Sequence, residues 1–312
     1  MFRGYIAAVV TPFRGGKIDF ESFGRHVEWL ADSGVSGIVV CGSTGESLAL
    51  TSQEQKDLIR FAREVVSSKV ISSKLVSEKI ELIGGVISSS TETCLNFMRN
   101  SEEYVDGFLC ICPPYIKPNQ TQIVTHFSKL SANTSKPIIL YNNPSRVGTS
   151  IERDAFDSLV KLKNIVAIKE CSRDLSRFTL WRKDLNRDFD FLTGNDDSAF
   201  GALAMGAVGV ISVSANVCPK LCVAAYDAFM RGDLADFARC RDILASLHSL
   251  MFAEPSPAPA KYALKRLGII VSEEVREPLT PISADLRRKI DEFLEKIVFE
   301  ERKQCRNIRK SA

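Results

Sequence analysis

The chain has 312 residues, of which 45% are apolar and 25% are charged, and its formal net charge at pH 7 is +3. These values are ordinary for a folded globular protein, and so small a charge gives no electrostatic footprint for nucleic acid. No run approaches the ~20 apolar residues that span a bilayer. The first apolar run, Ile6 to Val10, ends in Thr11-Pro12 without a cleavage pattern of small residues. We therefore expect a cytoplasmic protein with no membrane segment and no nucleic acid partner.

The cysteines give no sign of a disulfide framework or a metal site. There are nine, an odd number, and most lie inside apolar patterns, as Cys41, Cys110 and Cys112 do. Cys218 and Cys222 share one face of a predicted helix, but the chain has only three histidines and none is near them in sequence. Buried, reduced thiols are the usual state of such residues in a reducing compartment.

Short apolar runs alternate with amphipathic stretches eight times along the chain. The expected strands are Tyr5–Val10, Gly37–Cys41, Leu82–Val86, Gly107–Cys112, Pro137–Tyr141, Ile165–Lys169, Phe191–Thr193 and Val208–Ser212. The expected helices between them are Phe20–Asp32, Ser52–Val66, Thr91–Asn100, Gln120–Asn133, Arg153–Leu162, Leu175–Leu185, Ser198–Met205 and Pro219–Arg231. Eight βα units in series predict an α/β fold of the (β/α)8 TIM-barrel class. An open, doubly wound sheet is the alternative, and the glycine fingerprint that would favour it is missing after the first strand.

After Arg231 the strand patterns stop, and the sequence predicts a C-terminal helical appendix. The expected helices are Asp236–Phe252, Ala258–Leu267 and Ala284–Glu300, with the proline-rich segment Glu254–Pro259 as a stiff connector. We therefore divide the chain into a barrel domain, residues 1–231, and a helical region, residues 232–312.

Two polar segments fit this pattern poorly. Ser67–Lys79 is rich in serine and lysine and is interpreted as a surface insertion between the second helix and the third strand. Glu301–Lys310 carries a local excess of basic residues and is interpreted as a frayed, solvated tail.

The residue that carries most information is Lys169, which ends the apolar run Ile165–Ile168. A short run rich in β-branched residues predicts a strand buried on both faces. Burial disfavours the ammonium form of a lysine, and a free amine can attack a carbonyl. Lys169 is therefore a candidate Schiff-base residue. The alternative is a structural lysine that snorkels to solvent from the strand end.

Chemistry in a barrel of this class lies at the carboxyl ends of the strands. The second strand leads into Gly42–Ser47, where the hydroxyls of Ser43 and Thr44 and exposed amides suit an anion such as a carboxylate. A helix-capping turn is the alternative for that loop. The seventh strand ends at Gly194 and the eighth contains Ile211, in stretches whose small residues leave room for a ligand.

The fourth and fifth strands end in loops that present larger side chains. Tyr115 follows two prolines, and Tyr141 opens a segment that includes Arg146. Neighbouring strands place Tyr141 beside Lys169, where imine chemistry needs a proton shuttle. The planar fork of Arg146 suits a substrate carboxylate. The alternatives are a core tyrosine with a satisfied hydroxyl and a surface salt bridge.

Together these motifs resemble the pyruvate-dependent class I aldolases of the dihydrodipicolinate synthase and N-acetylneuraminate lyase superfamily. The similarity extends from Phe2 to about Pro281 and is carried by Gly42–Glu46, Tyr141–Arg146 and Ile168–Glu170.

Within the superfamily, Pro144–Gly148 is similar to the synthase version, whereas sialic acid lyases carry a small or apolar residue at the position of Arg146. The resemblance thus implies condensation of pyruvate with L-aspartate 4-semialdehyde, the first committed step towards diaminopimelate and lysine. One alternative is an aldolase or lyase for another 2-oxo acid, such as N-acetylneuraminate lyase. The other is a binding protein on the same scaffold.

The resemblance also implies a role for each candidate residue. Lys169 would form the imine with pyruvate, with no cofactor or metal, and Tyr141 and Ser43 would relay protons. Tyr115 would reach into the site of a neighbouring subunit across a tight dimer interface, in a homotetramer built as a dimer of dimers. The substrate-binding residues would be Thr44, Arg146, Gly194 and Ile211, of which Arg146 would hold the carboxylate of aspartate semialdehyde.

Lysine-inhibited members of the family have histidine, asparagine, glutamate and tyrosine in a pocket at the dimer interface. The matching positions in this chain are Ser52, Gln55, Ser89, Thr93 and Pro114. Because these residues supply neither a carboxylate nor an aromatic ring, we expect L-lysine to inhibit weakly or not at all.

Overall fold

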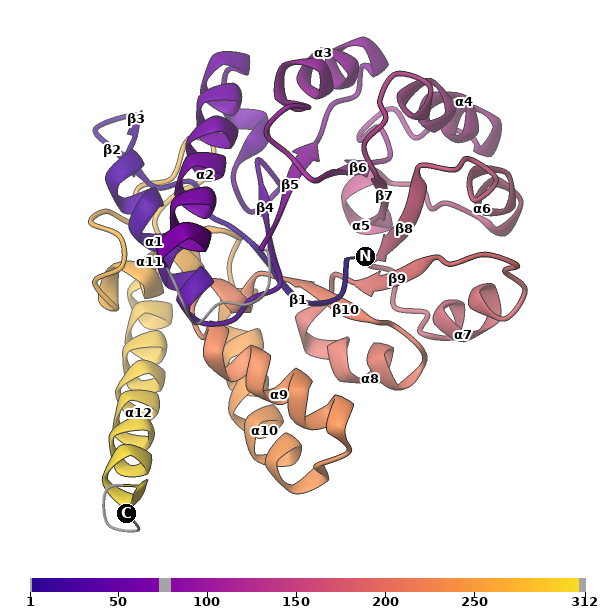
Figure 1. Cartoon of the computed structure of the whole chain (residues 1–312). Helices are drawn as coiled ribbons and strands as arrows, with labels where there is room; N and C mark the ends of the chain where they lie inside the picture. Colours follow the sequence, from indigo (N-terminus) through magenta and orange to yellow (C-terminus); the bar gives the residue numbers. More distant parts are fainter. Residues whose placement is uncertain (1, 73–79, 309–312) are drawn as a thin grey trace.

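The computed structural model describes residues 2–72 and 80–308. Eight parallel strands close into a barrel in the order β1-β10-β9-β8-β7-β6-β5-β4, with helices around the outside (Figure 1). The barrel strands are β1 (Gly4–Ala8), β4 (Gly37–Val40), β5 (Glu81–Val86), β6 (Gly107–Ile111), β7 (Ile138–Asn142), β8 (Ile165–Glu170), β9 (Asp190–Thr193) and β10 (Gly209–Ser212). The predicted (β/α)8 barrel is confirmed.

The helices of the barrel follow its strands in chain order. They are α1 (Phe20–Asp32), α2 (Ser52–Ser72), α3 (Thr91–Ser101), α4 (Gln120–Ser131), α5 (Pro144–Val147), α6 (Arg153–Leu159), α7 (Ser176–Arg182), α8 (Ala199–Ala204) and α9 (Pro219–Arg231), with short 3-10 turns η1 (Ser47–Ala49), η2 (Asp196–Ser198) and η3 (Ser214–Asn216). Several begin at a capping side chain: Asp19 accepts from Ser22 N and Ser90 accepts from Thr93 N. Because the helices cover the outside and side chains fill the inside, the strands are almost wholly buried.

The barrel closes through β1, which pairs with β4 on one side and β10 on the other. On the opposite side, the register of β7 and β8 places Tyr141 opposite Lys169 and Asn142 opposite Glu170. This pairing is the adjacency that the sequence predicted for Tyr141 and Lys169.

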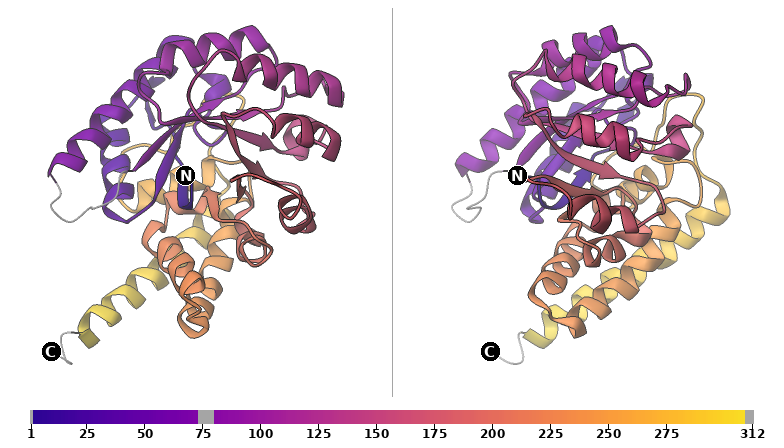
Figure 2. Two further views of the ribbon diagram at one scale, coloured as in Figure 1. Left: turned by 45° about the vertical axis from the view of Figure 1, so that its right-hand side comes forward. Right: turned by 90° about the vertical axis from the view of Figure 1, so that its right-hand side faces the viewer.

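Three helices follow the barrel: α10 (Leu234–Met251), α11 (Ala258–Arg266) and α12 (Ala284–Ile308). Helix α10 packs against α9, and α12 leaves the body of the barrel so that its far end projects outward (Figure 2). Helix α11 begins at Ala258, as predicted, and includes Pro259 in its first turn, so the connector from Glu254 ends at Pro257.

Two sequence predictions about polar segments were wrong. Helix α2 continues to Ser72, so Ser67–Ser72 are helical rather than part of a surface excursion, and Ser73–Lys79 lie outside the described residues. Helix α12 likewise continues to Ile308, through most of the expected frayed tail. In the second segment, the glutamate, lysine and arginine content that signalled solvent exposure is also compatible with a helix, since long charged side chains are good helix formers.

The sequence also gave no sign of a small hairpin after β1. Strands β2 (Phe13–Arg14) and β3 (Lys17–Ile18) pair antiparallel around Gly15 and Gly16, both of which have positive φ. Strands of two residues are too short to show alternation. The hairpin matters because it places Phe13, which is fully buried, beneath the C-terminal helical region.

Candidate active site

A cavity of about 670 Å³ opens at the carboxyl ends of the barrel strands. It is lined by seven of the eight residues that the sequence nominated: Ser43, Thr44, Tyr141, Arg146, Lys169, Gly194 and Ile211. The eighth, Tyr115, is not part of its lining in this chain. The ends of five strands, together with helix α5, thus meet at one edge of the barrel, as parallel strand ends do.

Lys169 lies within the cavity wall at the end of β8 and is only 6% exposed. Its Nζ lies 4.3 Å from the centre of the Tyr141 ring, over the face of the aromatic system. The side chain therefore does not snorkel to solvent. A buried amine beside a phenol is an arrangement that can form and protonate an imine.

Gly194, at the end of β9, leaves the space that the Lys169 side chain occupies. A Cβ built at this position would lie within 3.0 Å of both Lys169 Cε and Cys171 Sγ. Burial raises the pKa of the Cys171 thiol to about 11, although the charge of Lys169 opposes the shift. Because only a thiolate is strongly nucleophilic, the raised pKa disfavours Cys171 as a nucleophile.

Tyr141 is fixed through its hydroxyl. Asn143 Nδ2 donates to Tyr141 Oη at 3.0 Å, and Ser145 Oγ donates to Asn143 Oδ1 at 2.7 Å. Asn143 and Ser145 both line the cavity, so the phenol is the inner end of a hydrogen-bonded chain that reaches the substrate space. Sequence reasoning missed Asn143, although its place two residues after a strand-end tyrosine was a usable signal.

A buried polar network lies behind Lys169. Both carboxylate oxygens of Glu170 accept from Asn142 Nδ2 at 2.9 Å, and Arg177 Nε lies 3.4 Å from Glu170 Oε2. The Arg177 guanidinium stacks on the Trp181 ring, 3.9 Å from its centre. Since alternate residues of a strand face opposite sides, Glu170 points away from the cavity and ties the ends of β7 and β8 together. Lys169 is thereby held at a fixed depth.

Ser43 and Thr44 are carried by the loop between β4 and η1. The loop is closed by hydrogen bonds from Gly45 N to Gly42 O at 3.0 Å and from Glu46 N to Ser43 O at 3.1 Å. Thr11 Oγ1 donates to Gly45 O at 2.7 Å and links the loop to the segment after β1. Ser43 is half-buried and Thr44 is 7% exposed, so their hydroxyls meet a ligand only inside the cavity.

Arg146 lies on α5, at the outer part of the cavity, and its side chain is exposed. The helix starts at Pro144 and ends at Gly148, whose φ of 80° is accessible to glycine. Within the described part of the chain, no carboxylate lies at ion-pair distance from its guanidinium. The salt bridge that the sequence left open as an alternative is therefore not formed there, and the fork faces the cavity mouth.

Tyr115 stands apart from the other candidates. It is 91% exposed and has a φ of 73°, which is unusual for a bulky residue. A large aromatic ring held in solvent by an unusual backbone conformation is typical of a residue that contacts another chain. Its role in a neighbouring subunit's site stays a prediction.

One corner of the cavity contains a buried histidine that sequence reasoning did not connect with the site. His248 Nδ1 lies 2.8 Å from Ser214 Oγ, and Asp196 Oδ2 accepts from Val213 N and Ser214 N at 3.0 and 2.9 Å. Burial lowers the pKa of His248, which favours its neutral form. His248 comes from α10, so no spacing in the sequence could relate it to the strand ends.

Three of the positions that match the family's lysine pocket lie together. Ser52, Gln55 and Thr93 line a cavity of about 230 Å³, which we name the Ser52 cavity. Its remaining lining residues are Lys56, Asn96, Phe97, Asn100 and Ser101. Nearby, Ser89 Oγ donates to Pro114 O at 2.7 Å. The Ser52 cavity contains no carboxylate.

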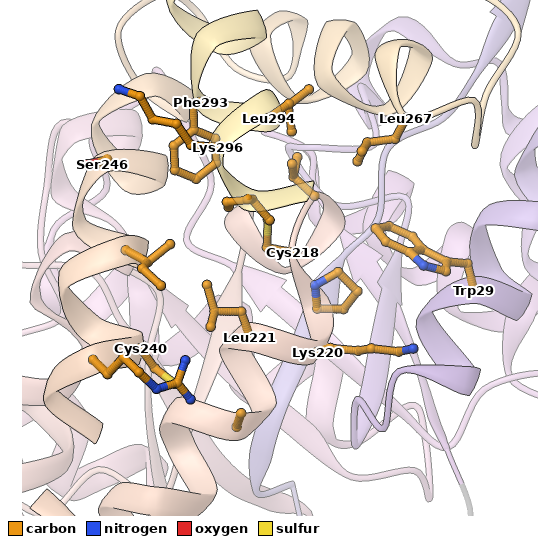
Figure 3. A pocket seen from close by; sticks show the side chains of 16 residues that line it. Trp29, Cys218, Lys220, Leu221, Cys240, Ser246, Leu267, Phe293, Leu294 and Lys296 are labelled. Atoms are coloured by element: carbon orange, nitrogen blue, oxygen red, sulfur yellow. The ribbon is translucent and has the colours of Figure 1, made fainter. Parts of the chain in front are cut away.

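A further cavity, of about 570 Å³, lies between α1, α9, α10 and α12 (Figure 3). Its wall is mostly apolar, with Trp29, Leu221 and Phe293 facing one another across it. The two lysines at its edge, Lys220 and Lys296, are exposed. None of the nominated residues lines this cavity.

Among residues 2–72 and 80–308, no cluster of three or more His, Cys, Asp or Glu side chains has a metal-binding arrangement. Within the same ranges, every helix is too short or too polar to cross a bilayer.

The fold and the lysine site define a (β/α)8-barrel enzyme of the class I aldolase type. A family model described as the dihydrodipicolinate synthetase family matches residues 1–297. The chain is 40% identical over 294 residues to the 4-hydroxy-tetrahydrodipicolinate synthase of Chelativorans sp. (strain BNC1), which covers 93% of this chain and 97% of that protein. It is also 40% identical over 298 residues to the enzyme of the same name from Erythrobacter litoralis, with coverage of 95% and 98%.

Solved structures give the same result. Dihydrodipicolinate synthase from Aquifex aeolicus superposes with a TM-score of 0.88 at 34% identity, over 95% of this chain and 98% of that chain. The enzyme from Cyanidioschyzon merolae, solved with lysine bound, superposes with a TM-score of 0.86 at 31% identity, over 94% and 97%. The chain belongs to the dihydrodipicolinate synthetase family.

Proposed function

We propose that the chain is a 4-hydroxy-tetrahydrodipicolinate synthase, a class I aldolase-type lyase that condenses pyruvate with L-aspartate 4-semialdehyde on Lys169. The observation that supports this most directly is the buried Lys169 amine against the Tyr141 ring, in one cavity with Ser43, Thr44 and Arg146. The family membership and the relatives of the same name support the choice of substrates over other 2-oxo acids.

The reaction begins when Lys169 Nζ attacks the C2 carbonyl of pyruvate. Loss of water gives the imine, and the phenol of Tyr141 and the hydroxyl of Ser43 move the protons that this step requires. The pyruvate carboxylate lies on the Ser43–Thr44 loop, whose amides and hydroxyls are donors for an anion. Gly194, which packs against the Lys169 side chain, and Ile211 form the wall beside the reacting methyl group.

Removal of a methyl proton converts the imine to an enamine, whose carbon attacks the aldehyde carbon of the second substrate. The Arg146 guanidinium pairs with the carboxylate of that substrate at the cavity mouth and orients it. The amino group of the second substrate then attacks the imine carbon, closes the ring and releases Lys169. The net products are 4-hydroxy-tetrahydrodipicolinate, one water and one proton, and no cofactor takes part.

The proposal includes an oligomer in which Tyr115 completes a neighbouring site, as a dimer of dimers. Its 91% exposure supports a contact with another chain. It also includes a cytoplasmic location, since the eight described cysteines are free thiols, as is usual in a reducing compartment.

The test is a pair of assays on the same preparation. A coupled assay with pyruvate and aspartate semialdehyde should show turnover, and a cleavage assay with sialic acid should show none. Turnover in the sialic acid assay alone would assign the site to an N-acetylneuraminate lyase. Inactivity in both, with no pyruvate adduct after borohydride reduction, would refute an enzymatic role for the site.

A further inference from the structure

The loop that carries Ser43 and Thr44 ends at Glu46, which has a left-handed backbone conformation with φ 54° and ψ 34°. This region is costly for a residue other than glycine, so such a conformation persists where its surroundings hold it. Glu46 does not line the cavity of Lys169, and its side chain is 2% exposed. Its carboxylate therefore points into the protein, away from the chemistry.

The carboxylate meets two groups from the C-terminal helical region. Lys261 Nζ, on α11, is in ion-pair contact with Glu46 Oε1, and the lysine side chain is fully buried. Arg276 N donates to Glu46 Oε2 at 2.9 Å. A charge taken this far from water requires a partner of opposite sign, and Lys261 supplies it.

Lys261 is itself held on three sides. Its ammonium donates to Glu274 O at 2.7 Å and lies 4.1 Å from the centre of the Phe13 ring. Burial lowers the pKa of Lys261 to about 8, while the negative charge of Glu46 opposes the shift and favours the ammonium form. The Glu46 carboxylate therefore keeps Lys261 in its charged form, and Lys261 in turn holds that carboxylate in place.

The connection continues on the far side of the loop. The Arg276 guanidinium pairs with Glu54 on α2, donates to Ala49 O at 2.7 Å and lies 4.5 Å from the Phe13 ring centre. The loop is thus held between α11 and α2. Of the two cationic side chains, Lys261 forms the ion pair with Glu46, whereas the guanidinium of Arg276 pairs with Glu54.

We propose that Lys261 is a positioning residue: it holds the Glu46 carboxylate and thereby keeps the Ser43–Thr44 loop in the geometry that receives the pyruvate carboxylate. Lys261 touches no substrate in this scheme, and the inference rests on the proposed function of that loop. It gives the helical region a part in the first step of the reaction. The inference also separates two steps of the reaction, since Arg146, which receives the second substrate, lies on α5 and not on the Ser43–Thr44 loop.

The test compares Lys261→Met with Lys265→Met. Methionine keeps most of the length and apolar volume of the stem and removes the charge. Lys265 lies on the same helix but is exposed and pairs with Glu273, so it is a matched control. The readouts are the pyruvate concentration that gives half-maximal borohydride-trapped adduct, the KM for aspartate semialdehyde, and the thermal unfolding midpoint.

Lys261→Met should raise the half-saturating pyruvate concentration at least tenfold while the KM for aspartate semialdehyde stays within twofold, and Lys265→Met should change neither. The double variant Glu46→Gln/Lys261→Met, which leaves no buried charge unpaired, should bind pyruvate better than Lys261→Met but three- to tenfold more weakly than the wild type. This non-additivity is the signature of a direct pairing. A purely structural lysine would lower the unfolding midpoint without changing the half-saturation of the folded protein.

A folded Lys261→Met protein whose pyruvate half-saturation is within twofold of the wild type would overturn the inference, as would a double variant no better than Lys261→Met. If Lys261→Met does not fold, the double variant Glu46→Gln/Lys261→Met provides the test. A half-saturating pyruvate concentration within twofold of the wild type in that variant would again overturn the inference. A wild type that traps no pyruvate refutes the proposed function and this inference together. If the wild type and Lys261→Met trap pyruvate with the same half-saturation, the inference is refuted but the proposed function is not.

Discussion

Replacing Gly194 by alanine tests whether the depth of Lys169 in the cavity controls imine formation. The new Cβ would lie within 3.0 Å of Lys169 Cε and Cys171 Sγ, and 3.2 Å from Lys169 Cδ. Ordinary carbon contacts are about 3.5–4.0 Å apart. The side chains of Lys169 and Cys171 must therefore shift by more than about 1 Å, because Gly194 N is fixed by a hydrogen bond to Glu170 O at 3.1 Å.

A displacement of about 1 Å at a reacting group costs about 100-fold in rate. At about 1.4 kcal/mol per factor of ten, this corresponds to roughly 2.7 kcal/mol added to the barrier of imine formation. Because the shift affects the nucleophile and not the Arg146 end of the cavity, the KM for aspartate semialdehyde should change little.

The assay is the rate of borohydride-trapped adduct formation at saturating pyruvate, followed by intact mass. The control is Gly24→Ala on α1, where an added Cβ meets its nearest atoms only at 3.4 Å, an ordinary contact, and where alanine is a better helix former than glycine. The control should trap at the wild-type rate. If a folded Gly194→Ala protein forms the trapped adduct at the wild-type rate, the position of the Lys169 side chain does not control imine formation.

Three further predictions concern the other nominated groups. Arg146→Ala should raise the KM for aspartate semialdehyde about 10- to 100-fold, the equivalent of losing charge-assisted hydrogen bonds, and leave pyruvate trapping nearly intact; equal damage to both steps would make the arginine structural. Mixing inactive Tyr115→Phe protein with inactive Lys169→Ala protein under subunit exchange should restore part of the activity, and no recovery despite proven exchange would assign Tyr115 to its own subunit's site. L-Lysine should inhibit weakly or not at all, because the Ser52 cavity offers hydroxyls and amides but no carboxylate for a second ammonium; half-inhibition below millimolar lysine in initial-rate assays at subsaturating pyruvate would contradict this.

The barrel could be predicted because its signals are local. Each buried strand appears as a short apolar run, and eight such runs with intervening helical patterns leave few alternatives. The nominated residues could be predicted for a related reason: the fold brings the carboxyl ends of its strands together, so Lys169, Tyr141 and Gly194 were found by examining strand ends alone. The register that pairs Tyr141 with Lys169 then follows from strand order.

What the sequence could not predict depends on contacts between distant segments. His248 and Lys261 come from the C-terminal helices, and neither has a spacing that relates it to a strand end. Glu46 was read only as part of a motif, since its left-handed backbone and its inward carboxylate depend on partners more than 200 residues away. The polar segments before Ser73 and after Glu300 were misread because composition alone does not separate an exposed helix from a loop.

The central claim is that pyruvate becomes covalently bound to Lys169. Borohydride reduction in the presence of pyruvate, followed by intact-mass measurement and peptide mapping, tests it directly. The account predicts one pyruvate-derived adduct per chain, on the peptide that contains Lys169, and none in Lys169→Ala. An adduct on another lysine, or an active enzyme that forms none, would contradict it.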